Sequence, residues 1–168
     1  MAKLIISCGV PGTGKTFWAK KYVPKNIKYV SRDDIRFSLL NDDDDYFEKE
    51  DEVWKLFIEE LSCGLAQGMT VWADATHLNE KARVKLINAL IIKPTEIEVA
   101  CFKCSLNTAI KRNEQREGRC RVPNDRIASM HAAYTMPKWK EGNYIYNRIY
   151  TIDTENNIIR IQEGKNNG

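Results

Sequence analysis

The sequence has no hydrophobic run long enough for a membrane span or a secretory signal. Its N-terminal apolar segment, Leu4–Cys8, is short and is followed at once by a glycine-rich loop. A transmembrane helix needs about 20 apolar residues, and a signal peptide needs a longer apolar stretch than this one. We therefore expect no membrane association and a cytoplasmic location.

Histidine is scarce and the cysteine count is odd, with two histidines and five cysteines. Cys101 and Cys104 form a C-x-x-C pair, but no second pair of cysteines or histidines follows at the spacing of a structural zinc site. A thioredoxin-like motif would lie at a helix start after an early strand, whereas this pair ends a late predicted strand. We expect reduced thiols, and we interpret His77 and His131 as structural.

The chain also lacks internal repeats, low-complexity tracts and Pro/Gly/Ser-rich linkers, so residues 1–168 are predicted to form a single domain. Predicted strands alternate with predicted helices. This order predicts an α/β fold: a parallel sheet of about five strands with helices on both faces. The expected strands are 4–7, 27–30, 70–73, 97–102 and 149–153.

Net charge is only +3, but the charges are unevenly distributed. Residues 41–60 carry ten acidic and two basic side chains, whereas residues 103–140 carry nine Lys or Arg and three Asp or Glu. A basic segment of this kind suits a polyanion such as a triphosphate or a nucleic acid. A solvated surface could have the same composition, so charge alone does not distinguish a polyanion-binding segment from an ordinary surface.

The segment Gly9–Thr16, GVPGTGKT, matches the P-loop pattern G-x-x-x-x-G-K-[ST]. The loop backbone and the following helix N-terminus are expected to bind phosphate oxygens. Lys15 would bridge the β- and γ-phosphates of ATP or another NTP, and the Thr16 hydroxyl would ligate Mg²⁺. The expected nucleotide-binding residues in this loop are Gly9, Gly12, Thr13, Gly14, Lys15 and Thr16.

A second polar group follows the predicted strand at 27–30. Asp33 and Arg36 are three residues apart at a helix start, so their side chains share one face. Asp33 could accept a proton from an attacking hydroxyl, and Arg36 could bind an acceptor phosphate. Helix capping with a surface ion pair explains the same residues, and both readings stay open here.

Asp74 ends an apolar strand, a position that in P-loop proteins often supports the metal through water. It could instead orient Arg36 or the acceptor, and we expect Asp74 and Thr76 to contact the substrate. Arg112 and Arg116 lie four residues apart on one helix face. They begin an arginine-rich stretch that could close as a lid over the triphosphate, with Arg116 stabilising the transferred phosphoryl group.

Taken together, GVPGTGKT, SRDDIR, DATHLN and KRNEQR resemble the kinase domain of phage-type polynucleotide 5′-hydroxyl kinases over residues 4–134. The resemblance implies that Lys15 and Thr16 serve ATP and Mg²⁺ and that Asp33 is the general base. It also implies that Arg36 binds the 3′-phosphate of the acceptor, that Asp74 supports the site, and that Arg112 and Arg116 form the lid. No phosphatase domain follows, so a separate phosphatase or ligase partner is expected in end-healing.

The leading hypothesis is therefore an ATP-dependent kinase acting on the 5′-hydroxyl ends of DNA or RNA. One alternative is a P-loop kinase of a small molecule such as a nucleoside, sugar or antibiotic. Another is a non-catalytic nucleotide-binding module, although a pure nucleotide switch needs no acceptor base such as Asp33. The sequence does not indicate an oligomeric state.

Overall fold

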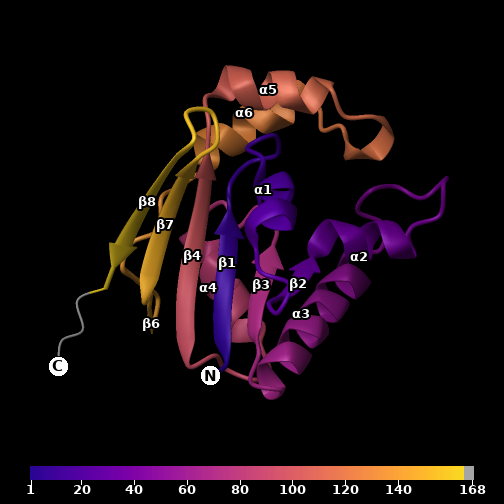
Figure 1. Cartoon of the computed structure of the whole chain (residues 1–168). Helices are drawn as coiled ribbons and strands as arrows, with labels where there is room; N and C mark the ends of the chain where they lie inside the picture. The colour runs from indigo at the N-terminus through magenta and orange to yellow at the C-terminus, as the bar shows by residue number, and fades with distance from the viewer. Residues whose placement is uncertain (165–168) are drawn as a thin grey trace.

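The computed structural model describes residues 1–164 and shows a six-stranded sheet flanked by helices (Figure 1). Neighbouring strands follow the order β2-β3-β1-β4-β7-β8, and every neighbouring pair is parallel except β7 with β8. A separate hairpin joins β5 and β6. The strands are β1 (Lys3–Cys8), β2 (Lys28–Ser31), β3 (Thr70–Asp74), β4 (Glu96–Lys103), β5 (Lys140–Glu141), β6 (Tyr144–Ile145), β7 (Arg148–Asp153) and β8 (Ile158–Glu163).

Six α-helices connect these strands within residues 1–164. They are α1 (Lys15–Tyr22), α2 (Arg32–Leu39), α3 (Glu50–Ala66), α4 (Glu80–Ala89), α5 (Leu106–Glu114) and α6 (Asn124–Ala133). Three of them begin at a side-chain cap: Ser31, Asn79 and Ser105 each accept a hydrogen bond from the backbone N–H three residues later. Such caps satisfy helix donors that have no intrahelical partner, so they fix where α2, α4 and α5 start.

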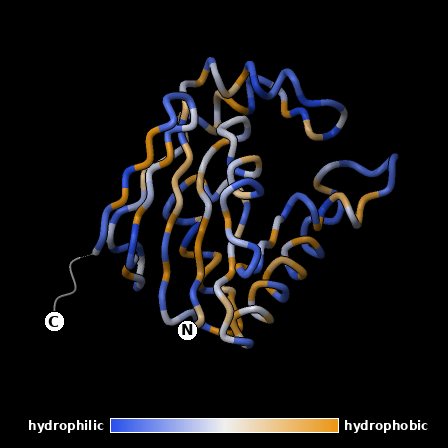
Figure 2. Tube along the Cα trace, viewed as in Figure 1, coloured by the Kyte–Doolittle hydropathy of each residue, from blue (hydrophilic) through white to orange (hydrophobic). Residues whose placement is uncertain are grey.

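The central strands are buried on both faces, which explains their continuous apolar sequences. Leu4, Val71 and Val99 face a core cluster that also contains residues of α3 and α4. Ile5 and Phe102 face a second cluster that includes residues of α1. Hydrophobic residues accordingly follow the central strands in Figure 2, while the loop after α5 is largely hydrophilic. The predicted α/β class with helices on both faces is confirmed.

The sequence prediction of about five parallel strands missed the last one. β8 pairs antiparallel with β7 and forms one edge of the sheet. The turn between them is set by Asp153, whose side chain accepts hydrogen bonds from the backbone N–H groups of Glu155 and Asn156, and by the left-handed backbone of Asn157. All six residues of β8 are exposed, so the strand lacks the alternating burial pattern by which strands are predicted.

A buried ion pair ties the C-terminal segment to α4. Arg83 donates from Nε and Nη2 to the two carboxylate oxygens of Glu141, at 2.7 and 2.6 Å, and both side chains are almost completely inaccessible to solvent. Tyr146 donates to the same carboxylate at 2.6 Å. Arg83 also donates to the backbone carbonyls of His77 and Thr135, so one guanidinium joins three segments.

The carboxyl ends of β1, β2, β3 and β4 meet at one edge of the sheet, the usual ligand edge of such folds. α5 and α6 lie across this edge in Figure 1, and the segments after α2 and after α5 project beside it. The elements that carry the predicted site residues therefore converge. Within residues 1–164, no helix combines the length and apolar composition needed to cross a bilayer.

Candidate active site

The loop Gly9–Thr16 connects β1 to α1 and packs directly against α5. Gly12 has φ of 87°, and a Cβ placed there would lie 2.3 Å from the carbonyl oxygen of Ala109. Gly14 also has φ of 87° and precedes α1 with no side-chain cap, so the first N–H groups of that helix remain available. A glycine loop leading into a free helix N-terminus forms a binding site for phosphate groups.

Lys15 lies at the centre of the charged groups at this edge. Its Nζ donates to the carbonyl oxygen of Val10 at 3.3 Å. Burial lowers the pKa of Lys15; the attraction of Asp74 and Asp33 opposes that shift, and repulsion by Arg116 adds to it. Three side chains that the sequence predicted as part of one site therefore influence the charge of Lys15.

Asp74 lies buried at the end of β3 and faces Thr16. Its carboxylate accepts hydrogen bonds from Ser7 Oγ and Thr16 Oγ1, both at 2.9 Å, and from the hydroxyl of Tyr29. A hydroxyl beside a carboxylate fits the ligand chemistry of Mg²⁺, which takes its remaining ligands from phosphate oxygens and water. Thr16 and Asp74 thus suit a magnesium site, and the hydrogen bond between them places Asp74 beside the start of α1.

Thr76 contributes to the site through its backbone. Its carbonyl oxygen accepts a hydrogen bond from the N–H of Gly9 at 2.9 Å. This contact joins the segment after β3 to the start of the phosphate loop. The sequence expectation was an acceptor contact for Thr76, whereas the contact present in the structure supports the loop.

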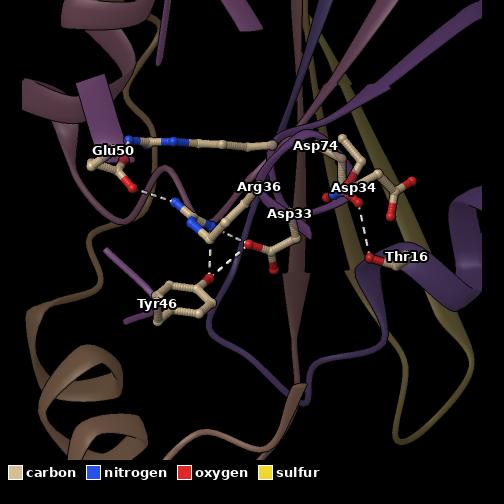
Figure 3. A network of polar contacts seen from close by, with 9 residues as sticks. Thr16, Asp33, Asp34, Arg36, Tyr46, Glu50 and Asp74 are labelled. Atoms are coloured by element: carbon tan, nitrogen blue, oxygen red, sulfur yellow. Dashed lines mark hydrogen bonds and ion pairs between the residues drawn. The ribbon is translucent and has the colours of Figure 1, made fainter. Parts of the chain in front are cut away.

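Asp33 is the exposed carboxylate of the site. It lies in the first turn of α2, its side chain is 60% exposed, and its Oδ1 accepts hydrogen bonds from Arg36 and from the hydroxyl of Tyr46 (Figure 3). The predicted pairing of Asp33 with Arg36 on one helix face is present. The carboxylate is therefore held at the sheet edge and stays open to a ligand.

Arg36 is enclosed, and its guanidinium is largely paired inside the protein. The residue is 4% exposed; Nη2 donates to Glu50 at 2.6 Å, and Nη1 donates to Asp33 and Tyr46. Nε is buried without a partner in residues 1–164. Arg36 was expected to bind an acceptor phosphate, but in this arrangement such a phosphate would have to displace one of these partners. The structure shows Arg36 supporting Asp33.

Arg112 and Arg116, the predicted lid residues, occupy different environments. Arg112 Nη1 donates to Thr154 Oγ1 at 2.7 Å and to the Gly12 carbonyl oxygen at 3.5 Å. Thr154 in turn donates to the carbonyl oxygen of Thr13 at 2.6 Å, so Arg112 is fixed over the phosphate loop. Arg116 lies beyond the end of α5 and is exposed.

Two projecting segments meet at this edge of the sheet: the acidic arm, residues 40–49, and the lid loop, residues 115–123. Arg119 of the lid loop donates to the carbonyl oxygen of Asn41 at 2.6 Å and also to that of Asp42. Arg126, just after the lid loop, lies 5.5 Å from the ring centroid of Phe47. The acidic arm is therefore held against the lid loop and α6.

Sequence reasoning missed Tyr46, Glu50 and Thr154. None of them belongs to a short motif; they reach Asp33, Arg36 and Arg112 because of the fold. An acidic residue such as Glu50 is a natural partner for a buried arginine. The sequence did not show that Arg36 is buried, so this pairing could not be predicted.

His77 has a structural environment, in keeping with its interpretation from the sequence. It is 5% exposed, and its Nδ1 lies 2.7 Å from the carbonyl oxygen of Ser7, a contact that requires the Nδ1–H tautomer. Burial lowers the pKa of His77 to about 4. The imidazole is thus neutral near pH 7.

Comparison with solved structures supports the fold. A chain of the Pnkp1/Rnl/Hen1 RNA repair complex matches with a TM-score of 0.68 and 22% identity over 78% of this protein. Our chain spans only 43% of the length of that chain. A sugar kinase from Janibacter sp. HTCC2649 matches with a TM-score of 0.64 and 15% identity, covering 91% of this chain and 86% of that one.

A third match is Kti12 from Chaetomium thermophilum, solved with ADP-AlF3. It has a TM-score of 0.63 and 14% identity over 90% of this chain and 89% of that one. At these identities the matches establish a P-loop kinase fold and leave the acceptor open. A family model described as an AAA domain matches residues 4–137, which include β1, the phosphate loop, Asp33, Asp74 and the lid arginines. With most of its length matched, the chain belongs to this AAA domain family, AAA_33, as a nucleotide-binding domain with a P-loop kinase fold.

Proposed function

We propose that this protein transfers the γ-phosphate of ATP to the 5′-hydroxyl end of a polynucleotide, with Asp33 as general base. The observation that carries the proposal is the exposed Asp33 carboxylate. It forms an ion pair with Arg36, and its negative charge raises the pKa of Lys15. A nucleotide switch has no use for such a group, whereas an alcohol acceptor needs a base near the terminal phosphate.

The remaining residues have complementary roles in the proposed reaction. The backbone of the loop and Lys15 would bind the β- and γ-phosphates, and Thr16 with Asp74 would hold Mg²⁺. When bound, Mg²⁺ neutralises negative charge on the phosphates. Arg112, already fixed over the loop by Thr154, would contact the triphosphate, and Arg116 would stabilise charge on the transferred group.

The choice of a polynucleotide as acceptor is supported by charge and by a structural relative. The segment 103–140, which is predominantly basic, lies across the edge where the acceptor would bind. A chain of an RNA repair complex also has a similar fold, with a TM-score of 0.68 over 78% of this protein. A phosphatase or ligase partner would supply the other steps of end repair, because neither chemistry is suggested by the site.

A small-molecule acceptor is the second candidate. The contact of Arg119 with the backbone of Asn41 joins the lid loop to the acidic arm beside Asp33. A contact that joins the two segments on this side would suit a compact acceptor such as a sugar or nucleoside.

The test is a phosphate-transfer assay with γ-labelled ATP, Mg²⁺ and 5′-hydroxyl DNA and RNA oligonucleotides, beside a panel of nucleosides and sugars. We expect label on an oligonucleotide, and a loss of about 10²- to 10⁴-fold in kcat for Asp33→Asn, the range typical of general bases. Asp51→Asn is the matched control, because Asp51 is an exposed carboxylate in the first turn of α3.

The outcomes separate the candidates. Label only on a small molecule replaces the polynucleotide by that acceptor class. Equal loss in both variants, or no transfer from the parent protein to any acceptor, would refute the assignment of Asp33 as a base.

A further inference from the structure

We infer that Tyr46 is a positioning residue for Asp33: its hydroxyl fixes one carboxylate oxygen so that the other faces the attacking alcohol. This inference rests on the proposed function. It adds a residue from the acidic arm, outside the segments GVPGTGKT, SRDDIR, DATHLN and KRNEQR, to the catalytic arrangement.

The hydrogen bonds around Asp33 form a closed triangle. Tyr46 donates from its hydroxyl to Asp33 Oδ1 at 2.7 Å, and Arg36 Nη1 donates both to the Tyr46 oxygen at 2.7 Å and to the same Oδ1 (Figure 3). Both donors reach Oδ1, and no hydrogen bond to Oδ2 is formed within residues 1–164. One oxygen is thus anchored, and the second is left to accept a proton.

The ring of Tyr46 is itself held by its neighbours. The Arg36 guanidinium lies 4.2 Å from the ring centroid, a cation–π distance. Phe37 and Phe47 make edge-to-face contacts with the ring at centroid distances of 6.1 and 4.7 Å. These contacts therefore fix the position of the Tyr46 hydroxyl.

The backbone of the acidic arm also has internal support. Asp44 accepts a hydrogen bond from the N–H of Asn41 at 2.8 Å, and Glu48 accepts one from the N–H of Asp45 at 3.0 Å. Lys49 donates to the carbonyl oxygen of Leu39 at 2.6 Å, which closes the base of the arm against α2. The acidic side chains thus bond the arm's own backbone, and the arm can place Tyr46 reproducibly.

The Tyr46 hydroxyl remains a donor under working conditions. Burial raises the pKa of Tyr46, and the neighbouring Asp33 carboxylate raises it further. The phenol is therefore protonated at neutral pH and can donate to the carboxylate continuously.

The experiment compares the parent protein with Tyr46→Phe, which keeps the ring and removes the hydroxyl, in the transfer assay with the acceptor that the parent phosphorylates. We expect a fall of about tenfold in kcat, equal to about 1.4 kcal/mol, because an Asp33 carboxylate without this hydrogen bond can rotate away from the attacking alcohol. The KM for ATP should change less than about twofold, since the contacts of the phosphate loop do not involve Tyr46.

A double-mutant cycle supplies the readout that a general loss of structure would not produce. In an Asp33→Asn background, Tyr46→Phe should lower the residual kcat by less than about twofold, because its effect passes through Asp33. Tyr22→Phe is the matched control: Tyr22 is an exposed tyrosine whose hydroxyl makes no hydrogen bond within residues 1–164.

Two results overturn the inference alone: an unchanged kcat in Tyr46→Phe, or the same fold loss in both backgrounds. If the parent protein phosphorylates no acceptor, the proposed function fails and this inference fails with it. The two failures are therefore distinguishable by the parent's activity.

Discussion

Replacing Gly12 by alanine tests whether contact between the phosphate loop and α5 is needed for nucleotide binding. A Cβ at this position would lie 2.3 Å from the Ala109 carbonyl oxygen, and ordinary contact begins at 3.4 Å. α5 would have to move away by about 1.1 Å. Because α5 carries Arg112, which bonds the Gly12 carbonyl and Thr154, the shift would also displace that arginine.

Gly12→Ala should lower the free energy of unfolding for two reasons, which a control variant can separate. An alanine in the left-handed region costs about 1–2 kcal/mol, and forced overpacking adds about 1–3 kcal/mol. Gly68 provides the control, because it has φ of 72° and a Cβ added there would meet no atom within 4 Å. Gly68→Ala should show only the first cost, whereas Gly12→Ala should show both.

Urea denaturation would give the two free energies of unfolding, and calorimetric titration would give the Kd for ATP with Mg²⁺. We expect Gly12→Ala to raise that Kd at least about tenfold, equal to about 1.4 kcal/mol, and Gly68→Ala to leave it unchanged. If both variants lose the same stability and keep the parent's affinity, the contact between the loop and α5 has no such role.

Two further predictions concern stability. The lowered pKa of His77, about 4, means that its stabilising contribution is complete above pH 6.5 and is lost as pH falls to about 4, because the unfolded chain binds the proton first. Guanidinium denaturation should show that the free energy of unfolding of the parent falls by about 3 kcal/mol more than that of His77→Gln over this pH range. Identical pH dependence in the two proteins would contradict this prediction. Arg83→Leu should cost about 3–5 kcal/mol by leaving Glu141 buried without its partner. The double variant with Glu141→Leu should regain much of that in the same assay, and a loss below about 1 kcal/mol in the single variant would argue against the ion pair's role.

The sequence predicted much of the framework because the relevant signals are local. A glycine loop between an apolar strand and a helix predicts a phosphate site at one sheet edge, and Asp33 with Arg36 at three-residue spacing predicts a shared helix face. In the structure the glycine loop lies between β1 and α1, and Asp33 pairs with Arg36. β8 was missed because its residues are exposed and carry no burial pattern.

The sequence by itself determined the α/β class, the phosphate loop and which strand ends carry acidic residues, because these depend on short-range periodicity and on chain order. Only the tertiary structure decided what each side chain contacts. It pairs the buried Arg36 with Glu50, and it forms the hydrogen bonds of Thr16 with Asp74 and of Tyr46 with Asp33. Such pairings join residues from separate elements, so they depend on how those elements pack. No single segment of the sequence indicates that packing.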